Sequence, residues 1–301
     1  MGRAVRRLAI LAAACFAYGT FVEPYDFRVR RARLKVLPPG AAPIRVLHIS
    51  DFHLLASQHR KRAFIQALAG LEPDLVVSTG DNLASPDALA PLIDDLGRLL
   101  DVPGAFVFGS NDYTAPRPKN PLGYLAGDTS REGVHADRQQ LPTEELRTAF
   151  TSHGWLDLNG KRGVLDVRGL RIEFRGTDDA HLNLDDYRLV AGRPAKGTDV
   201  AIGVTHAPYA RVLDAMTADG LPLILAGHTH GGQVCVPGFG ALTTNCDLSP
   251  RQAKGASRHH AAGKRSWLHV SAGLGANPYT PFRFACPPEV SLLTLVAGSN
   301  G

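Results

Sequence analysis

The sequence predicts an α/β fold with a largely parallel sheet. Apolar runs of strand length, rich in β-branched and aromatic residues, alternate with segments whose apolar residues recur at helical spacing. A repeated strand–helix–strand order is typical of parallel strands covered by helices. The chain has 301 residues, of which 44% are hydrophobic and 20% are charged. This length and composition suit a large core and exclude a disordered protein.

The first half of the chain supplies three predicted strands and the two helices that connect them. Leu89, Leu92 and Leu96 lie on one stripe of the second helix, at the spacing of an amphipathic helix. The predicted ranges are strands at 45–50, 75–79 and 105–108, and helices at 61–71 and 86–100.

The second half begins with a predicted hairpin and then continues the alternation of strand and helix. Residues 164–167 and 171–174 are joined by Arg-Gly-Leu, which favours two antiparallel strands. The ranges that follow are a strand at 199–205, a helix near 209–219, a strand at 221–226, and late strands at 267–271 and 290–296, which are candidates for a second sheet.

Two stretches have the composition of loops. Residues 114–142 are rich in Pro and Gly and lack periodicity, and a loop of this length inside a domain predicts a lid or rim of a functional site. Residues 251–265 are polar, and we expect a solvated surface loop there. His259 and His260 within it are expected to be surface residues and not a metal-ligand pair.

The net charge of +5 comes from the N-terminal leader. Residues 1–36 hold eight basic and two acidic residues, which leaves 25 basic and 26 acidic residues in the remainder. Since the rest of the chain is neutral, nucleic-acid binding is not predicted.

The leader also contains an apolar run of fifteen uncharged residues, 8–22, preceded by three arginines. As a helix this run would span roughly 22 Å, less than the ~30 Å core of a bilayer. It fits a secretory signal, for which Ala17-Tyr18-Gly19 is a candidate cleavage site, or a short signal-anchor; a buried N-terminal helix is the alternative. We therefore divide the chain into a leader at 1–36 and a domain at 37–301, and expect a membrane-associated or exported protein.

The four cysteines, at positions 15, 235, 246 and 286, show no CxxC spacing. This excludes a zinc ribbon and favours buried free thiols, with a disulfide among the last three as the alternative.

The residues that follow the apolar runs are the main functional signal. In open α/β sheets, ligands bind beyond the carboxyl ends of the strands. Five predicted strands end in Asp, His or Asn, and these side chains would converge on one place. The residues are Asp51 and His53, Asp81, Asn111 and Asp112, His206, and His228 and His230.

Such a set of side chains is suited to metal binding. Imidazole and carboxylate groups are ligands of Zn, Mn, Fe or Ni, and an amide oxygen completes an oxygen-rich shell. The set is too large for one tetrahedral ion, so we expect two divalent ions with a bridging ligand. Asp51 and Asp81 supply only two negative charges against four positive ones. The site would stay electropositive, which favours a phosphate ester as substrate.

The motifs Asp51-x-His53, Gly80-Asp81 and Gly227-His228-Thr229-His230, with an Asn after the third strand and His206 between, stand in the order found in one superfamily. Over about residues 44–297 the chain resembles the calcineurin-like metallophosphoesterases. The run 227–233 and the apolar leader look like the bacterial branch with an N-terminal membrane anchor.

This resemblance implies a four-layer α/β/β/α sandwich with a dinuclear metal site at the carboxyl ends of the strands. It implies hydrolysis of phosphomonoesters or phosphodiesters by a metal-bound hydroxide, and the anchor suggests a lipid or cell-envelope phosphoester. Asp81 would bridge the two ions. Carried over by position, Asp51, His53 and His230 would hold one ion, and Asn111, His206 and His228 the other.

The chain departs from the family pattern at Gly109-Ser110-Asn111-Asp112, where the family has Gly-Asn-His-Asp or Gly-Asn-His-Glu. Matching the glycines places Ser110 on the ligand, whereas matching the asparagines places Asp112 on the histidine. We prefer the second register because Ser is a poor ligand for a divalent ion, and Asp112 then becomes the candidate catalytic residue near the leaving group. Because either register removes the histidine, a non-catalytic module that binds metal or a phosphate ligand is the alternative function.

Further residues are candidates for substrate binding. Arg117 and Lys119 could reach a phosphate from the predicted lid, and Asp178, Asp179 and His181 follow a strand of the hairpin and could line the site. His48 and His269 lie within apolar strands, and we expect them in the core.

Overall fold

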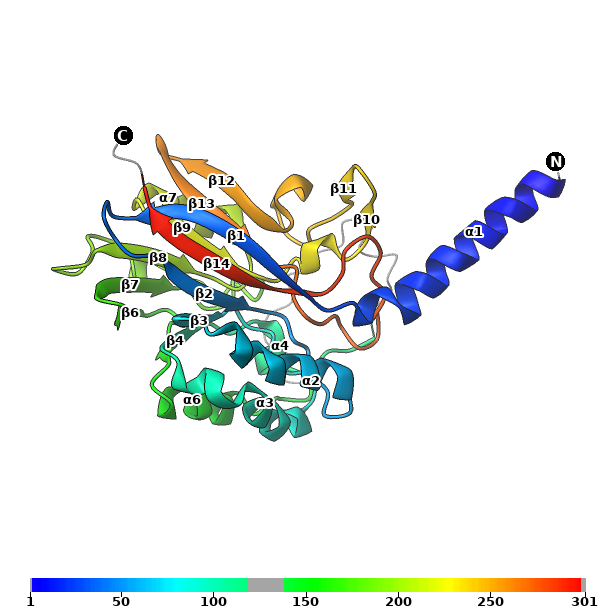
Figure 1. The fold of residues 1–301 in the computed structure, drawn as a ribbon, viewed down its shortest axis with the longest axis horizontal. Coiled ribbons are helices and arrows are strands. Elements are labelled where there is room, and N and C mark those ends of the chain that lie inside the picture. Colours follow the sequence, from blue (N-terminus) through cyan, green and yellow to red (C-terminus); the bar gives the residue numbers. More distant parts are fainter. Residues whose placement is uncertain (1, 119–137, 299–301) are drawn as a thin grey trace.

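The computed structural model describes residues 2–118 and 138–298, in which two six-stranded sheets pack face to face (Figure 1). Both sheets are mixed. In the first, β2, β3, β4 and β5 are parallel, and β14 joins β2 in the antiparallel sense and β1 in the parallel sense. The order of the first sheet is β1 (Arg28–Leu37), β14 (Glu289–Ala297), β2 (Ile44–Ile49), β3 (Leu75–Ser78), β4 (Gly104–Phe106) and β5 (Leu156–Asp157).

The second sheet has a parallel centre and an antiparallel hairpin at each edge. Its order is β12 (Gly255–Ala261), β13 (Lys264–Val270), β9 (Leu223–Ala226), β8 (Val200–Val204), β7 (Leu170–Gly176) and β6 (Arg162–Val167). A separate short hairpin consists of β10 (Cys235–Val236) and β11 (Gly240–Ala241).

Helices cover the outer faces of both sheets, as Figure 1 shows for the first sheet. Those on the first sheet are α2 (His59–Ala67), α3 (Leu89–Leu96) and α6 (Thr143–Ser152), and α7 (Ala210–Ala218) packs on the second sheet. α4 (Ser110–Tyr113) lies at the functional site, and α1 (Gly2–Phe21) projects from the body of the molecule (Figure 1). The short 3-10 helices are Glu23–Tyr25, Leu68–Leu71, Pro86–Ala88, Gly97–Asp101, Tyr187–Leu189, His230–Gly232 and Pro250–Gln252.

Three apolar layers hold this arrangement together. The first lies between the helices and the first sheet and includes Leu92, Phe106 and Phe150, all fully buried. The second lies between the two sheets, where Val77 faces the strands of the second sheet, and the third lies under α7. The predicted α/β/β/α sandwich is therefore confirmed.

The structure corrects the expected start of the domain. Residues 28–37 form β1 and pair with β14 along its length, although we assigned residues 28–36 to the leader. Leu34 and Leu37 in this strand are buried, while its arginines are largely exposed. Charged residues are typical of an edge strand, and here they concealed a strand of the first sheet.

The polar stretch 251–265 is also different from our prediction. It contains the 3-10 helix Pro250–Gln252 and the strand β12, with the first residues of β13 after the turn. Side chains alternate between half-buried and exposed along β12, as at the edge of a sheet, and His260 is exposed. Nε2 of His259 lies 2.7 Å from Oδ1 of Asp214 in α7.

Smaller differences concern the limits and places of elements. The helix expected at 86–100 ends at Leu96, since Gly97 adopts a positive φ of 46° and a 3-10 helix continues from it. The late strand β14 joins the first sheet, whereas β13 joins the second. His48 and His269 are fully buried, as expected, with their Nδ1 atoms 2.9 Å apart between the two sheets.

Candidate metal centre

The ends of five strands meet at one rim of the sandwich. Asp51 and His53 follow β2, Asp81 follows β3, and Asn111 follows β4 in the first sheet. From the second sheet, His206 follows β8, and His228 and His230 follow β9.

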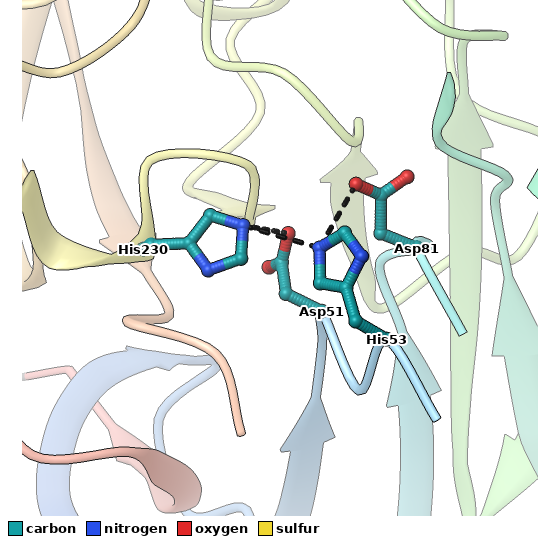
Figure 2. A group of neighbouring side chains, drawn as sticks. All are labelled: Asp51, His53, Asp81 and His230. Atoms are coloured by element: carbon teal, nitrogen blue, oxygen red, sulfur yellow. Dashed lines mark hydrogen bonds and ion pairs between the residues drawn. The ribbon is translucent and has the colours of Figure 1, made fainter. Parts of the chain in front are cut away.

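Four of these side chains form a compact group (Figure 2). One potential ligand atom from each of Asp51, His53, Asp81 and His230 lies within 4.8 Å of the others. Nε2 of His230 is 3.5 Å from Oδ1 of Asp51 and 3.2 Å from Nε2 of His53. Nε2 of His53 is 3.4 Å from Oδ2 of Asp81. These distances are short enough for one ion to be shared by the group.

A second group lies on the other side of Asp81. Nε2 of His206 is 3.6 Å from Oδ2 of Asp81 and 3.3 Å from Nδ1 of His228. The backbone N–H of Asn111 donates to Oδ1 of Asp81 at 2.7 Å, and its side-chain amide lies 2.8 Å from Oδ2. Asp81 therefore contacts both groups, which is the arrangement that a bridging ligand of two ions requires.

Backbone carbonyls fix the orientation of three histidine rings. Nδ1 of His206 donates to the Thr79 carbonyl at 2.6 Å, and Nδ1 of His230 donates to the Gly275 carbonyl at 3.0 Å. Each bond leaves Nε2 as the ring nitrogen that faces the site. In His228 the roles are reversed, because its Nε2 is 3.1 Å from the Asn245 carbonyl and its Nδ1 faces His206.

The candidate ligands are held in an unusual backbone conformation. A positive φ in a residue other than Gly costs about 1–3 kcal/mol and is concentrated at functional sites. Five of the seven candidate ligands adopt it: Asp51 (51°), His53 (40°), Asp81 (55°), His228 (69°) and His230 (49°).

Glycine allows the strand ends to approach one another. A Cβ on Gly109 would overlap Oδ1 of Asp81 and lie 2.6 Å from the ring of His206. A Cβ on Gly273 would lie 2.6 Å from that of Asp51. Glycine is thus required at position 109, because the side chains of Asp81 and His206 pack closely against its backbone.

Charge is distributed unequally over the site. Burial lowers the pKa of His53 and of His230 to about 4, so both rings are neutral at pH 7. Burial also lowers the pKa of His206, but Asp81, Asp179 and Asp51 raise it by more, to about 9. Burial raises the pKa of Asp81, but His206 and His53 lower it by more, and this carboxylate stays ionised.

Asp112, our candidate catalytic residue, is not placed to contact a substrate. It is fully buried, and its Oδ2 accepts hydrogen bonds from the backbone N–H of Asp81 at 2.7 Å and of Gly109 at 3.0 Å. Its Oδ1 accepts from the backbone and side-chain nitrogens of Asn82 at 2.8 and 3.1 Å. The carboxyl group therefore holds the backbone of the turn that contains Asp81, and it does so through hydrogen bonds on the side away from the cavity. Burial and the charge of Asp81 raise the pKa of Asp112 to about 7.

A cavity of about 350 Å³ opens beside the two groups. Ser110 and Asn111 both line it, so the choice of register between them stays a prediction. Arg117 and His181, predicted to bind substrate, also line it.

Two other candidates for substrate binding, Asp178 and Lys119, are not found among the residues that line the cavity in the described structure. Oδ1 of Asp178 accepts hydrogen bonds from the Tyr113 hydroxyl at 2.7 Å and from the Asp179 backbone N–H. Lys119 and most of the predicted lid lie outside the described residues.

Sequence reasoning missed the groups that position the ligands. The carbonyls of Thr79, Asn245 and Gly275 orient the histidine rings, and no side-chain pattern announces a backbone acceptor. Arg138 lines the cavity from the far end of the predicted lid. Asp179 is fully buried with one oxygen that makes no hydrogen bond in the described structure. Asp179 was among the residues expected to line the site, because it follows a predicted strand.

The chain is similar in sequence to known proteins and in fold to solved structures. The uncharacterized metallophosphoesterase YkuE of Bacillus subtilis is 25% identical over 300 residues, covering 95% of this chain and 92% of that protein. Phosphodiesterase YaeI of Escherichia coli is 26% identical over 299 residues, covering 95% of each. A solved structure, the 5′-nucleotidase precursor of Thermus thermophilus, has a TM-score of 0.43 and 16% identity, covering 84% of this chain and 55% of that one.

The family described as calcineurin-like phosphoesterase matches residues 44–232. This range starts before Asp51, ends after His230 and takes in more than half of the chain. The chain belongs to the calcineurin-like phosphoesterase family.

Proposed function

We propose that the chain is a metal-dependent hydrolase of phosphomonoesters or phosphodiesters with two divalent ions at the meeting point of its sheets. The position of Asp81 within 3.4 Å of His53 and 3.6 Å of His206 is the observation that carries the proposal. Asp51, His53 and His230 would hold one ion, Asn111, His206 and His228 the other, and Asp81 both.

The donor set fits such a centre. Imidazole and carboxylate ligands suit Mn, Fe, Zn or Ni, and hydrogen bonds to backbone carbonyls already turn one ring nitrogen of three of the four histidines towards the site. When bound, two such ions supply Lewis acidity and an activated water for in-line attack on phosphorus. The protein contributes the orientation of the ligands and the cavity beside them. Arg117 and Arg138 at the cavity add positive charge for a phosphate group.

The position of Asp112 limits the help that a leaving group receives. All its oxygen atoms face N–H donors of the turn that carries Asp81, so it provides no proton in the cavity. General-acid help is typically worth about 10²–10⁴-fold. We therefore expect esters with acidic leaving groups, such as p-nitrophenol, to be hydrolysed far faster than alkyl esters.

The test is hydrolysis of p-nitrophenyl phosphate and bis(p-nitrophenyl) phosphate by chelated protein re-supplied with Mn, Fe, Zn or Ni, with the bound ions counted. We expect two ions per chain and turnover of at least one ester. Asp81→Ala should lose both ions and Asp51→Ala only one, whereas Asp166→Asn, which alters an exposed carboxylate, should lose neither. One ion per chain, unaffected by Asp81→Ala, would refute the two-ion centre.

A second candidate is a non-catalytic module that binds metal or a phosphate ligand. The burial of Asp112 favours it. In the preferred register Asp112 aligns with the family histidine, and its carboxyl group faces a backbone N–H and not the cavity. Uptake of two ions without turnover of either ester would select this function.

The N-terminal helix is proposed as a membrane anchor. Residues Gly2–Tyr25 are long and apolar enough to cross a membrane, with a mean hydropathy of 1.5 over the most apolar window. Only 6% of that window is buried in the protein, so the apolar side chains of the helix are not covered by the rest of the described chain. Gly19, within the possible cleavage site, is buried against the domain, which favours retention of the helix.

A further inference from the structure

Two segments beside the cavity contain no charged residue. Residues 231–245 and 270–282 lack Asp, Glu, Lys and Arg, in a chain where one residue in five is charged. The first contains the β10–β11 hairpin, and the second runs from the last residue of β13 into the connection that leads to β14. Four large apolar side chains on them face solvent, and we call them the apolar rim: Phe239 (76% exposed), Tyr279 (57%), Val236 (44%) and Leu242 (44%).

The apolar rim is continuous with the mouth of the cavity. Leu242 belongs to both, and Val234, Thr280 and Phe282 line the cavity from the same two segments. A molecule that lies against the rim is therefore next to the route by which a substrate reaches Asp81. Single exposed apolar residues are common, whereas several of them gathered beside a cavity are a candidate interaction surface.

The base of α1 is fixed to one of these segments. The ring of Phe16 stacks on Phe282 with centroids 5.8 Å apart. The backbone N–H of Arg283 donates to the Gly19 carbonyl at 2.9 Å, and a Cβ on Gly19 would overlap the Phe282 ring.

The next turn of the chain strengthens this attachment. Glu23 is 2% exposed, and its carboxylate accepts hydrogen bonds from the backbone N–H groups of Ala285 and Cys286. The point at which α1 leaves the body is thus set by the fold, and the β10–β11 hairpin lies on the same side of the molecule (Figure 1).

We infer that the apolar rim docks on the surface of a lipid bilayer, and that the site acts on phosphoesters carried by lipids. The inference rests on the proposed function and on the proposed anchor. With α1 in the bilayer, its fixed base holds the rim and the cavity mouth at the membrane surface. Aromatic side chains are favoured at that interface, and the absence of charge lets the rim enter it. A lipid phosphoester could then reach the cavity with its acyl chains still in the bilayer.

Docking is tested with the full-length chain in vesicles of phosphatidylcholine and phosphatidylglycerol whose acyl chains carry bromine, a quencher of tryptophan. Phe239→Trp should add emission that brominated vesicles quench. The matched control is Leu189→Trp, since Leu189 is 67% exposed and lies outside the rim and cavity; its added emission should not be quenched. Trp155 and Trp267 provide the background. Equal emission of Phe239→Trp in brominated and ordinary vesicles would overturn docking.

The substrate class is tested by comparing two esters of the same leaving group. Soluble bis(p-nitrophenyl) phosphate is set against a diacylglycerol p-nitrophenyl phosphodiester in vesicles. The double variant Phe239→Ser, Tyr279→Ser should lose at least about tenfold on the lipid ester, since both side chains would no longer bury apolar surface in the bilayer interface, and should stay within about twofold on the soluble ester.

The outcomes separate the two proposals. Cleavage of the soluble ester but not the lipid ester would overturn the lipid substrate and leave the hydrolase. Failure to cleave either ester with any metal would overturn the hydrolase, and with it the substrate class, while quenching still reports docking. Emission of Phe239→Trp that shifts to the blue without bromine quenching would place the rim against protein and overturn docking.

Discussion

Asp112 acts on the site through the backbone. The two oxygens of its carboxylate accept hydrogen bonds from Asp81, Asn82 and Gly109, which form the turns after β3 and β4. The carboxylate thus connects two strand ends that carry candidate ligands. A buried acceptor with several N–H partners is costly to replace because each partner would lose its bond in a place that water does not reach.

We expect Asp112→Asn to destabilise the protein. The new NH2 group would face an N–H donor in place of an acceptor, at a cost of about 1–3 kcal/mol in the free energy of unfolding. Urea unfolding of the metal-free variant measures this cost, and Asp166→Asn, at an exposed carboxylate, is the control. An unchanged midpoint would show that Asp112 does not support the turn.

The protonation of His206 predicts a pH dependence of metal binding. Burial lowers its pKa, but Asp81 and other carboxylates raise it by more, to about 9. In the metal-free protein at pH 6 to 8 the ring therefore carries a proton that a metal ion must displace. Affinity should rise about tenfold per pH unit across this range, since binding releases one proton.

Titration against a chelator of known affinity at pH 6, 7 and 8 checks this. His53 and His230, with pKa values of about 4, are already neutral there and add no slope. The ion to follow is the one that His206 would hold. If its affinity were the same at pH 6, 7 and 8, His206 would not be protonated in the metal-free protein.

At the scale of elements, β1 decides where the domain begins. It pairs with β14 and buries Leu34 and Leu37 at the edge of the first sheet. The connection from α1 is also packed, since Glu23 is buried against the segment before β14. A cut after residue 36, which the charge pattern favoured, would remove both.

We expect two truncated chains to behave differently. A chain that begins at Gly19 keeps β1 and Glu23, and should be soluble with the thermal stability of the full-length protein. A chain that begins at Pro38 should lose about 3–6 kcal/mol, estimated from two buried leucines at about 1.5–3 kcal/mol each. Thermal unfolding of both chains gives the comparison. Equal melting temperatures would mean that β1 adds little to the fold.

At the scale of the whole molecule, the candidate centre joins the two sheets. Asp51, His53 and Asp81 come from the first sheet, and His206 and His230 come from the second. A ligand that binds only the folded state raises stability by mass action, by about 2.7 kcal/mol at a concentration of 100 times Kd. Metal bound at this place would hold the sheets to one another.

Removal of metal should therefore lower the melting temperature of the full-length protein, and re-supply should restore it. The shift should vanish in Asp81→Ala, which removes the shared ligand, and remain in Asp166→Asn. Differential scanning calorimetry with and without a chelator measures it. A shift that persists in Asp81→Ala would place the stabilising ion elsewhere.

The sequence by itself determined the fold class and the candidate ligands. Strand and helix are encoded locally, in the period of apolar residues, so β2, β3, β8 and β9 lie close to where they were predicted. The convergence of the candidate ligands could be predicted because each follows a strand, and the carboxyl ends of parallel strands meet at one edge. His206 and Asp81, far apart in the chain, were placed together on that ground.

Only the tertiary structure decided the rest. Whether the charged residues 28–37 form a leader or an edge strand depends on β14, more than 250 residues away. The orientation of each histidine depends on a backbone carbonyl, which every residue has and no pattern marks. Asp112 follows a strand as Asp51 and Asp81 do, yet its carboxylate turns inward to N–H groups of neighbouring turns. Local sequence places a side chain at a strand end, and packing against distant segments decides which way it faces.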